Sequence, residues 1–255
     1  MNKQISPVII SCSTKPSGMG MVVYNSFYKS SGMNFSYVSV LPDNVESIVS
    51  ALRTLNLYGA SISMPFKELI VPLLDELDET AVLAKSVNTV KNMNGKLVGY
   101  STDYIAVKAL MEKINPKSIR VIGTGAIAKL GVIVAREVSV ERIVAVSRSC
   151  DKTQEFADSY GIRRENYNQT SYDHVDLLFN ATPETNMSER LIERCNTYFE
   201  AQVADKSSYS LTAAKKIGKN IVAGSEMYIT QVSRQFQIYH DIKISEDKIL
   251  KSLEI

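Results

Sequence analysis

The feature that most constrains the fold of this chain is a glycine-rich turn at Gly123-Thr124-Gly125, between an apolar strand-like run and a helical run. With the next residues, Ala126-Ile127-Ala128, it fits the pattern G-x-G-x-x-A. The first glycine permits a tight turn, the second lets the backbone approach a pyrophosphate, and the small third residue lets the helix pack on the strand. Because a helix N-terminus favours negative charge, the turn predicts a dinucleotide-binding Rossmann unit. An ordinary tight strand-to-helix turn is the alternative.

The strand that follows this turn bears on which dinucleotide is bound. NAD-preferring sites usually carry an acidic residue about 20 positions after the turn. Here the strand ends in Val146-Ser147-Arg148-Ser149, with no acid at its tip. The planar guanidinium of Arg148 can stack on adenine and pair with a 2′-phosphate. This ending favours NADP over NAD, and a solvated surface arginine is the alternative.

The rest of the chain alternates between strand and helix patterns. Residues 8–10, 35–40 and 59–63 have the character of strands, and Asn44 is placed to cap a helix whose apolar face begins at Val45. The pair Asn94-Gly95 is a hairpin signal. Further strands end near Asn180 and at 221–223, before a helical run from 227 to 239. We therefore expect an α/β protein with a mostly parallel N-terminal sheet, a Rossmann-type domain and a cleft between them.

Composition bounds the class of protein. A chain of 255 residues with 45% hydrophobic and 22% charged residues suits two globular domains. The net charge is +2 and the basic residues are scattered, so we expect no nucleic acid partner. The three cysteines form no C-x-x-C pair and the only histidines, His174 and His240, lie far apart, so we expect reduced thiols and no metal. The N-terminus lacks a signal-peptide pattern and no stretch reaches about 18 apolar residues, so we expect a cytoplasmic protein with no membrane partner.

An amine, an amide and a carboxylate lie upstream of the glycine-rich turn. Lys67 stands in Ser-Met-Pro-Phe-Lys-Glu, Asn88 in Ser-Val-Asn-Thr, and Asp103 in Gly-Tyr-Ser-Thr-Asp. An oxidoreductase that interconverts a hydroxyl and a ketone needs such groups: the nucleotide carries the hydride, an amine moves the proton and a carboxylate holds the amine. A lone lysine on a helix is more often a solvated charge, so the company of Asn88 and Asp103 makes the functional interpretation preferable.

The ordered set of motifs resembles the shikimate and quinate dehydrogenase family. Its members carry Asn-Val-Thr-x-Pro-x-Lys, then Val-Asn-Thr, then Gly-x-Asn-Thr-Asp; this chain has matching runs at 61–67, 87–89 and 99–103. Asn180-Ala181-Thr182-Pro183 resembles the loop near the nicotinamide. Gly224-Ser225-Glu226-Met227, followed by Gln231, resembles the segment that closes the substrate pocket. The matches run in order over nearly the whole chain.

The resemblance implies an NADP-dependent enzyme that reversibly reduces 3-dehydroshikimate to shikimate, or acts on a related cyclic polyhydroxy carboxylate such as quinate. Lys67 would give and take the proton, and Asp103 would orient it. Such an enzyme serves the chorismate pathway of aromatic amino acid biosynthesis, as a monomer or a homodimer. The expected domains are 1–104 with 227–255 for the substrate, and 105–226 for the dinucleotide.

The resemblance also implies which residues bind the ligands. The expected substrate-binding residues are Ser63, Asn88, Gln231, Ser11, Ser13 and Ser17. The expected cofactor-binding residues are Gly123, Thr124, Gly125, Ala126, Ile127, Ser147, Arg148, Asn180, Ala181, Thr182 and Gly224. No metal ligand is expected.

The chain departs from the family where the substrate carboxylate is held. Family members begin with Ser-x-Ser-Pro-x-x-His-Asn, whereas here the serine positions are Gly18 and Gly20, and Tyr24 stands for the histidine. The asparagines of two further motifs are Ser61 and Ser101. Two alternatives therefore stay open: a dehydrogenase of this family with a different substrate, or a binding protein that barely turns over. Retention of the lysine and aspartate speaks against the binding protein, because a pure binder needs no proton-transfer group.

Overall fold

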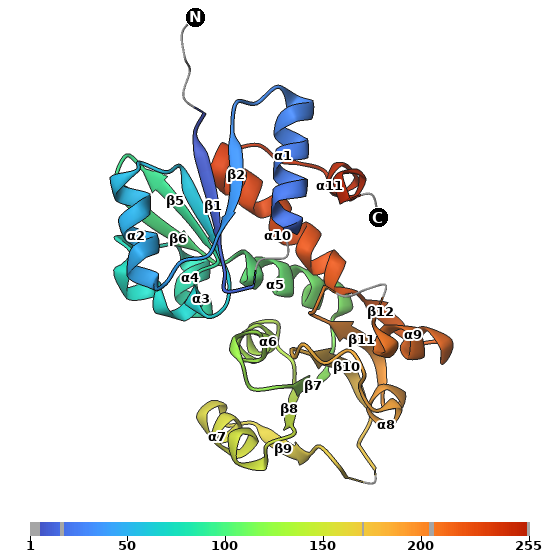
Figure 1. The fold of residues 1–255 in the computed structure, drawn as a ribbon. Coiled ribbons are helices and arrows are strands. Elements are labelled where there is room, and N and C mark those ends of the chain that lie inside the picture. The colour runs from blue at the N-terminus through green and yellow to red at the C-terminus, as the bar shows by residue number, and fades with distance from the viewer. Residues whose placement is uncertain (1–5, 16–17, 170, 204–206, 254–255) are drawn as a thin grey trace, which may run out of the picture. The chain divides into compact units, whose positions relative to one another are not determined.

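The chain forms two compact α/β units, as expected for its fold class (Figure 1). The computed structural model describes residues 6–15, 18–169, 171–203 and 207–253. Contacts divide the chain into unit 1, Met1–Ile105 with Ile229–Ile255, and unit 2, Ala106–Tyr228. Both divisions fall inside continuous helices, Thr102–Ile114 and Gly224–His240. Ser17 lies outside the described residues.

Unit 1 is built on a six-stranded sheet in the order β2-β1-β3-β5-β6-β4. Strands β1, β2 and β3 are parallel, whereas β5 runs antiparallel to both β3 and β6. Helices α1 and α10 lie on one face and α2 on the other (Figure 1). The strands are β1 (Val8–Cys12), β2 (Ser36–Val40), β3 (Gly59–Ile62), β4 (Glu76–Leu77), β5 (Thr89–Met93) and β6 (Lys96–Tyr100). The helices are α1 (Met19–Ser31), α2 (Val45–Thr54), α3 (Phe66–Leu69), the short 3₁₀ turn η1 (Val71–Leu73), α4 (Glu79–Ala84) and α11 (Glu246–Leu253). Two helices are shared with unit 2: the start of α5 (Thr102–Ile114) and most of α10 (Gly224–His240) belong to unit 1.

Local sequence signals account for several of these elements. The Asn44 side chain accepts a hydrogen bond from the Ser47 amide at 2.8 Å, so it caps α2 as expected. Asn94 and Gly95 have φ values of 55° and 96°, the left-handed conformations that a two-residue hairpin turn needs between β5 and β6. Pro65 is the residue directly before α3.

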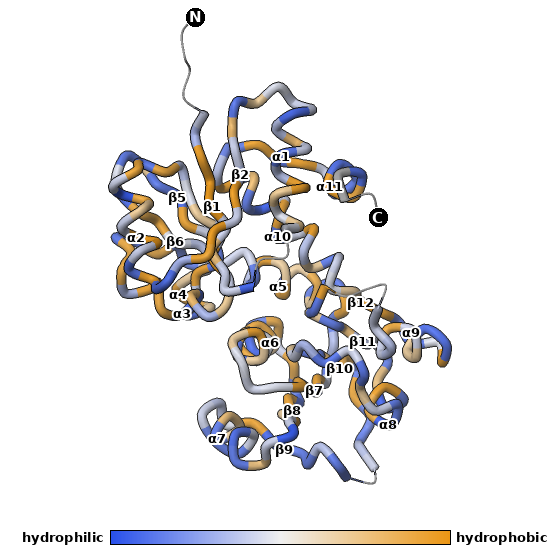
Figure 2. The backbone as a smooth tube through the Cα atoms, in the orientation of Figure 1, coloured by the Kyte–Doolittle hydropathy of each residue, from blue (hydrophilic) through white to orange (hydrophobic). Residues whose placement is uncertain are grey.

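Unit 2 is a six-stranded parallel sheet in the order β12-β11-β10-β7-β8-β9. If β7 to β12 are numbered 1 to 6 and the sheet is read from β9, the order is 3-2-1-4-5-6, that of the Rossmann fold. Strand β7 carries hydrophobic residues, whereas the edge strand β9 is hydrophilic (Figure 2). The strands are β7 (Ser118–Ile122), β8 (Arg142–Ser147), β9 (Arg163–Asn166), β10 (Val175–Asn180), β11 (Cys195–Glu200) and β12 (Asn220–Val222). The helices are α6 (Ala126–Glu137), α7 (Cys150–Tyr160), α8 (Glu189–Glu193) and α9 (Tyr209–Lys216).

The described residues contain neither a membrane-spanning helix nor a metal-binding cluster. In that part of the chain, no helix combines the length and the apolar character needed to cross a bilayer. The same residues hold no group of three or more His, Cys, Asp or Glu side chains arranged to hold a metal ion.

We predict that Gly131→Ala destabilises unit 2. Gly131 lies in α6, and a Cβ there would stand 2.5 Å from Cε1 of Phe179 on β10, a side chain that is fully buried. Overpacking of this kind costs about 1–3 kcal/mol, more than the helix propensity that alanine adds. Chemical denaturation should show a lower midpoint for Gly131→Ala. Gly125→Ser is the matched control, because no atom lies within 4 Å of a Cβ there and serine is a good N-cap; equal stability of the two variants would contradict the prediction.

We also predict that His240 makes unit 1 less stable in mild acid. Burial and the nearby Lys91 lower the pKa of His240 from 6.5 to about 4, with partial opposition from Asp241. Between these two values the unfolded chain binds a proton that the folded chain does not, so the free energy of unfolding falls as the pH drops through this window. Thermal melts at neutral pH and at about pH 5 should show a smaller loss for His240→Gln than for the unchanged chain. The exposed His174, changed to Gln, is the control and should behave like the unchanged chain.

Candidate active site

The centre of the candidate site is the carboxylate of Asp103, in the first turn of α5. Lys67 Nζ donates to Asp103 Oδ2 at 2.6 Å, and the two side chains are only 15% and 5% exposed. Gln231 Nε2 donates to Asp103 Oδ1 at 2.6 Å. Both carboxylate oxygens are therefore held by donors, and the helix N-terminus adds favourable charge. Three of the residues named from the sequence meet here, from α3, α5 and α10.

Asn88 fixes the start of α5 beside this carboxylate. Its Oδ1 accepts from the Thr102 amide at 2.8 Å, and its Nδ2 donates to Thr102 Oγ1 at 2.9 Å. Thr89 Oγ1 also donates to Asn88 Oδ1, at 3.0 Å. Asn88 is buried, so the structure gives it a positioning contact to the backbone that carries Asp103. The substrate contact expected from the sequence would be made by the second N–H of the Asn88 side-chain amide.

A second layer of contacts holds α10 against the sheet. Gln235, one turn after Gln231, donates from Nε2 to Thr89 Oγ1 at 2.9 Å. Its Oε1 accepts from the Tyr24 hydroxyl at 2.5 Å. Gln235 is not among the residues expected from the sequence, although its spacing of four from Gln231 places both on one helix face. Tyr24, which stands at the family's histidine position, thus joins α1 to α10.

The segment where the family holds a carboxylate has a different lining here. Gly18 is the residue before α1 and has a φ of 74°, while a Cβ on Gly20 would lie 2.9 Å from Cε1 of Tyr37. The ring of Tyr37 stacks on that of Tyr24 at 4.2 Å. Burial raises the pKa of Tyr37, although hydrogen bonds with Ser61 and Ser11 partly oppose this. An aromatic ring therefore packs directly against a position where the family has a serine.

The remaining predicted substrate residues lie in varied settings. Ser11 bonds Tyr37, and the buried Ser13 hydroxyl accepts from the Lys15 amide at 3.0 Å. Ser63 is exposed next to α3. The structure thus brings Lys67, Asp103, Gln231 and Asn88 together. Of the predicted serines that the structure describes, Ser11 and Ser13 have other partners, and Ser63 is exposed.

Unit 2 presents the expected glycine-rich turn. Gly123 has a φ of 108°, and a Cβ there would lie 2.8 Å from Cγ2 of Thr182, so both conformation and packing require glycine. Gly125 has a φ of −80° and no atom within 4 Å of a Cβ position, so neither strain nor packing explains it. Space left open at a helix N-terminus fits the approach of a dinucleotide pyrophosphate. Thr124 is half-buried, as are Ala126 and Ile127, the first residues of α6.

The loop after β10 is organised from within. The fully buried Asn180 donates from Nδ2 to the Glu184 carbonyl at 2.7 Å, and its Oδ1 accepts from the amide and hydroxyl of Thr182. Its side chain therefore shapes the loop that carries Ala181 and Thr182. Gly224, at the start of α10, packs against backbone, because a Cβ there would lie 2.2 Å from the Gln202 carbonyl oxygen.

The end of β8 presents an exposed guanidinium. The Arg148 side chain is 76% exposed and its Nη1 lies 3.8 Å from Glu184 Oε2. The Ser147 hydroxyl instead bonds Thr153 at 2.6 Å, within α7. Such a loosely paired arginine at the tip of the second Rossmann strand can turn toward a 2′-phosphate.

Comparisons with known proteins agree with this fold. Residues 14–90 match the model of the shikimate dehydrogenase substrate binding domain. A shikimate dehydrogenase-like protein of Haemophilus influenzae is 29% identical over 95% of this chain and 94% of its own length. The NADP(+) shikimate dehydrogenase of Pyrococcus abyssi is 26% identical over 91% of this chain and 92% of its own.

Solved structures give the same picture. A shikimate 5-dehydrogenase-like protein superposes with a TM-score of 0.88 at 28% identity, covering 100% of this chain and 98% of that one. A shikimate dehydrogenase solved with NADP+ superposes with a TM-score of 0.82 at 25% identity, covering 98% and 95%. The family-model match and the relatives named shikimate dehydrogenase or shikimate dehydrogenase-like support a place in the shikimate and quinate dehydrogenase family.

Proposed function

We propose that this chain is an NADP-dependent oxidoreductase that interconverts a ring hydroxyl and a ketone on a cyclic polyhydroxy carboxylate. Shikimate and 3-dehydroshikimate are the first pair to test, and quinate is the second. The observation that carries the proposal is the Lys67–Asp103–Gln231 arrangement, in which an ammonium is held by a carboxylate that is itself held by an amide. The names of the relatives support the reaction class and the cofactor.

The roles proposed for Lys67, Asp103 and Gln231 follow from the hydrogen bonds that join their side chains. NADP supplies or accepts the hydride when it is bound. Lys67 has two N–H groups besides the one directed at Asp103, and one of these would donate to the substrate oxygen as a ketone becomes a hydroxyl. Asp103 would keep the ammonium aimed at that oxygen, and Gln231 would keep the carboxylate from rotating. In the reverse direction the lysine would take the proton back.

A second candidate is a dehydrogenase of the same family with a different substrate. It is favoured by the glycines at positions 18 and 20 and by the ring of Tyr37 against Gly20. Hydroxyl donors that would hold a ring carboxylate are missing from those two positions. The two candidates are separated by assaying the protein with a panel of shikimate, quinate and their analogues. Turnover is measured as the change in absorbance of the reduced nicotinamide. Turnover of shikimate supports the first, turnover of an analogue alone supports the second, and tight binding without turnover would indicate a binding protein.

We predict that Lys67→Met lowers kcat with the substrate that the panel identifies by roughly 10²–10⁴-fold, the usual contribution of a positioned proton donor. KM should change little, because the proton is transferred only in the transition state. The exposed Lys29 of α1, changed to Met, is the matched control and should leave both constants unchanged. A Lys67→Met variant with near-normal kcat would remove the lysine from the mechanism.

We predict that Arg148→Ala weakens NADP binding by about tenfold or more, because a charge-assisted contact to a phosphate is lost. NAD binding should change much less, since NAD lacks the 2′-phosphate. Titration calorimetry with both dinucleotides measures this, and the exposed Arg190 of α8, changed to Ala, is the control. Equal loss for the two dinucleotides would mean that Arg148 does not read the 2′-phosphate.

A further inference from the structure

An ion pair in unit 2 joins two segments on either side of the glycine-rich turn. Arg148 directly follows β8, and Glu184 lies four residues after the end of β10. Arg148 Nη1 is 3.8 Å from Glu184 Oε2. Strands β8 and β10 both pair with β7 in parallel, so their carboxyl ends share one edge of the sheet with the turn that follows β7. The pair therefore lies at the edge where a Rossmann fold binds its dinucleotide.

The carboxylate of this pair is held in place. Glu184 Oε1 accepts a hydrogen bond from the Asn186 amide at 3.1 Å. The Glu184 carbonyl accepts from Nδ2 of the fully buried Asn180 at 2.7 Å, and the Glu184 amide donates to the Thr182 hydroxyl at 3.2 Å. Thr182 also packs on the glycine-rich turn, because its Cγ2 lies 2.8 Å from the position of a Cβ on Gly123. The backbone and the side chain of Glu184 are thus both fixed relative to the turn.

The guanidinium of the pair is held much less firmly. The Arg148 side chain is 76% exposed, against 37% for Glu184, and a separation of 3.8 Å is longer than a hydrogen bond. An exposed pair of this kind contributes little to stability, because solvent screens it and the arginine loses rotamer freedom. A phosphate binds a guanidinium more strongly, since it offers two oxygens in the plane of the N–H groups. Arg148 can therefore leave Glu184 when a phosphate is available.

A carboxylate fixed beside Arg148 bears on which dinucleotide is bound. NADP carries a 2′-phosphate that NAD lacks, so only NADP needs this guanidinium as a phosphate partner. Arg148 must be released from Glu184 before it pairs fully with that phosphate. NAD-preferring sites carry an acidic residue about 20 positions after the turn; here the end of β8 has no acid, and the loop after β10 brings a carboxylate to Arg148. The loss of the ion pair therefore weakens the binding of NADP and not that of NAD.

We propose that Glu184 is a specificity-determining residue that reduces the preference for NADP over NAD. Its carboxylate competes with the 2′-phosphate for Arg148 and leaves NAD binding unchanged. This role rests on the proposed function for the cofactor alone, because dinucleotide binding is measured without turnover.

The first test is titration calorimetry of the full chain with NADP and with NAD. Glu184→Gln removes the charge but keeps an oxygen that accepts from the Asn186 amide, so the loop should keep its shape. The variant should bind NADP about threefold to fivefold more tightly, the size of an exposed ion pair, and NAD binding should change by less than about 1.5-fold. Unchanged or weaker NADP binding overturns the proposal, and so does an equal gain for both dinucleotides.

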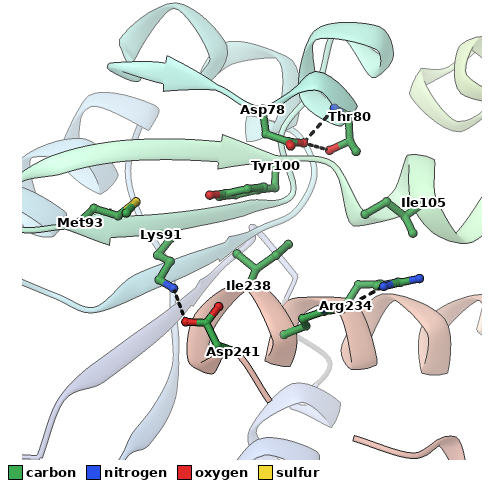
Figure 3. A pocket seen from close by; sticks show the side chains of 10 residues that line it. Asp78, Thr80, Lys91, Met93, Tyr100, Ile105, Arg234, Ile238 and Asp241 are labelled. Atoms are coloured by element: carbon green, nitrogen blue, oxygen red, sulfur yellow. Dashed lines mark hydrogen bonds and ion pairs between the residues drawn. The ribbon is translucent and has the colours of Figure 1, made fainter. Parts of the chain in front are cut away.

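The matched control is Asp241→Asn. It removes the carboxylate of another ion pair with a 3.8 Å separation, Lys91–Asp241, which lies in unit 1 (Figure 3). Asp241 has a φ of 58°, and asparagine adopts this left-handed conformation as readily as aspartate does. The control should bind both dinucleotides like the unchanged chain. The same gain for NADP in this variant would trace the effect to the overall charge of the chain and remove the role of Glu184.

A double-mutant cycle tests whether the effect passes through Arg148. In a chain that already carries Arg148→Ala, no guanidinium remains to compete for, so Glu184→Gln should change NADP binding by less than about 1.5-fold. A gain as large as in the unchanged background would mean direct repulsion of the 2′-phosphate and would overturn the competition.

The same measurements separate this inference from the proposed function. If the chain shows the expected selectivity but turns over no substrate of the panel, the role of Glu184 stands and the dehydrogenase function is refuted. If neither dinucleotide binds, both are refuted.

Discussion

The ion pair between Lys67 and Asp103 is the contact on which the arrangement of unit 1 depends. Its side chains are almost fully removed from solvent, and removing charges from water costs several kcal/mol per ion unless each finds partners. Gln231 supplies the second partner of the carboxylate, although it lies 128 residues further along the chain. The last part of the chain must therefore return to unit 1, and α10 provides that return.

The same requirement explains the polar layer around the pair. Asn88 ties the start of α5 to the start of β5, and Gln235 ties α10 to Thr89 one residue on. Each of these side chains is buried and bonded to a partner from another element, so a shift of one element leaves a donor or acceptor unsatisfied. Buried networks of this kind fix relative positions to a narrow range, as proton transfer between named atoms requires.

Much of the fold could be predicted from local patterns, and most of what was missed depends on tertiary contacts. The glycine-rich turn, the Asn44 cap and the Asn94-Gly95 hairpin are encoded by a few neighbouring residues. Strand β11 was missed because its sequence, Cys-Asn-Thr-Tyr-Phe-Glu, lacks an apolar run; its Glu200 is buried and accepts from Tyr198 and Ser208. In the candidate site, motif order was enough to name the lysine, aspartate and glutamine. The link from Tyr24 to Gln235 spans 211 residues and carries no local signal.

The residues proposed for proton transfer and the glycines at the altered serine positions lie on different helices, which has a consequence for substrate specificity. The residues proposed for proton transfer lie on α3, α5 and α10, whereas the two glycines at the serine positions of the first motif, Gly18 and Gly20, lie at the start of α1. Gly18, Gly20 and the ring of Tyr37 are not bonded to Lys67 or Asp103 in the contacts described above, so changes there leave the ion pair in place. Under the proposed function, a substrate with a different group at the position of the ring carboxylate can then be accepted without a change in the reacting groups, because different helices carry the two sets of residues.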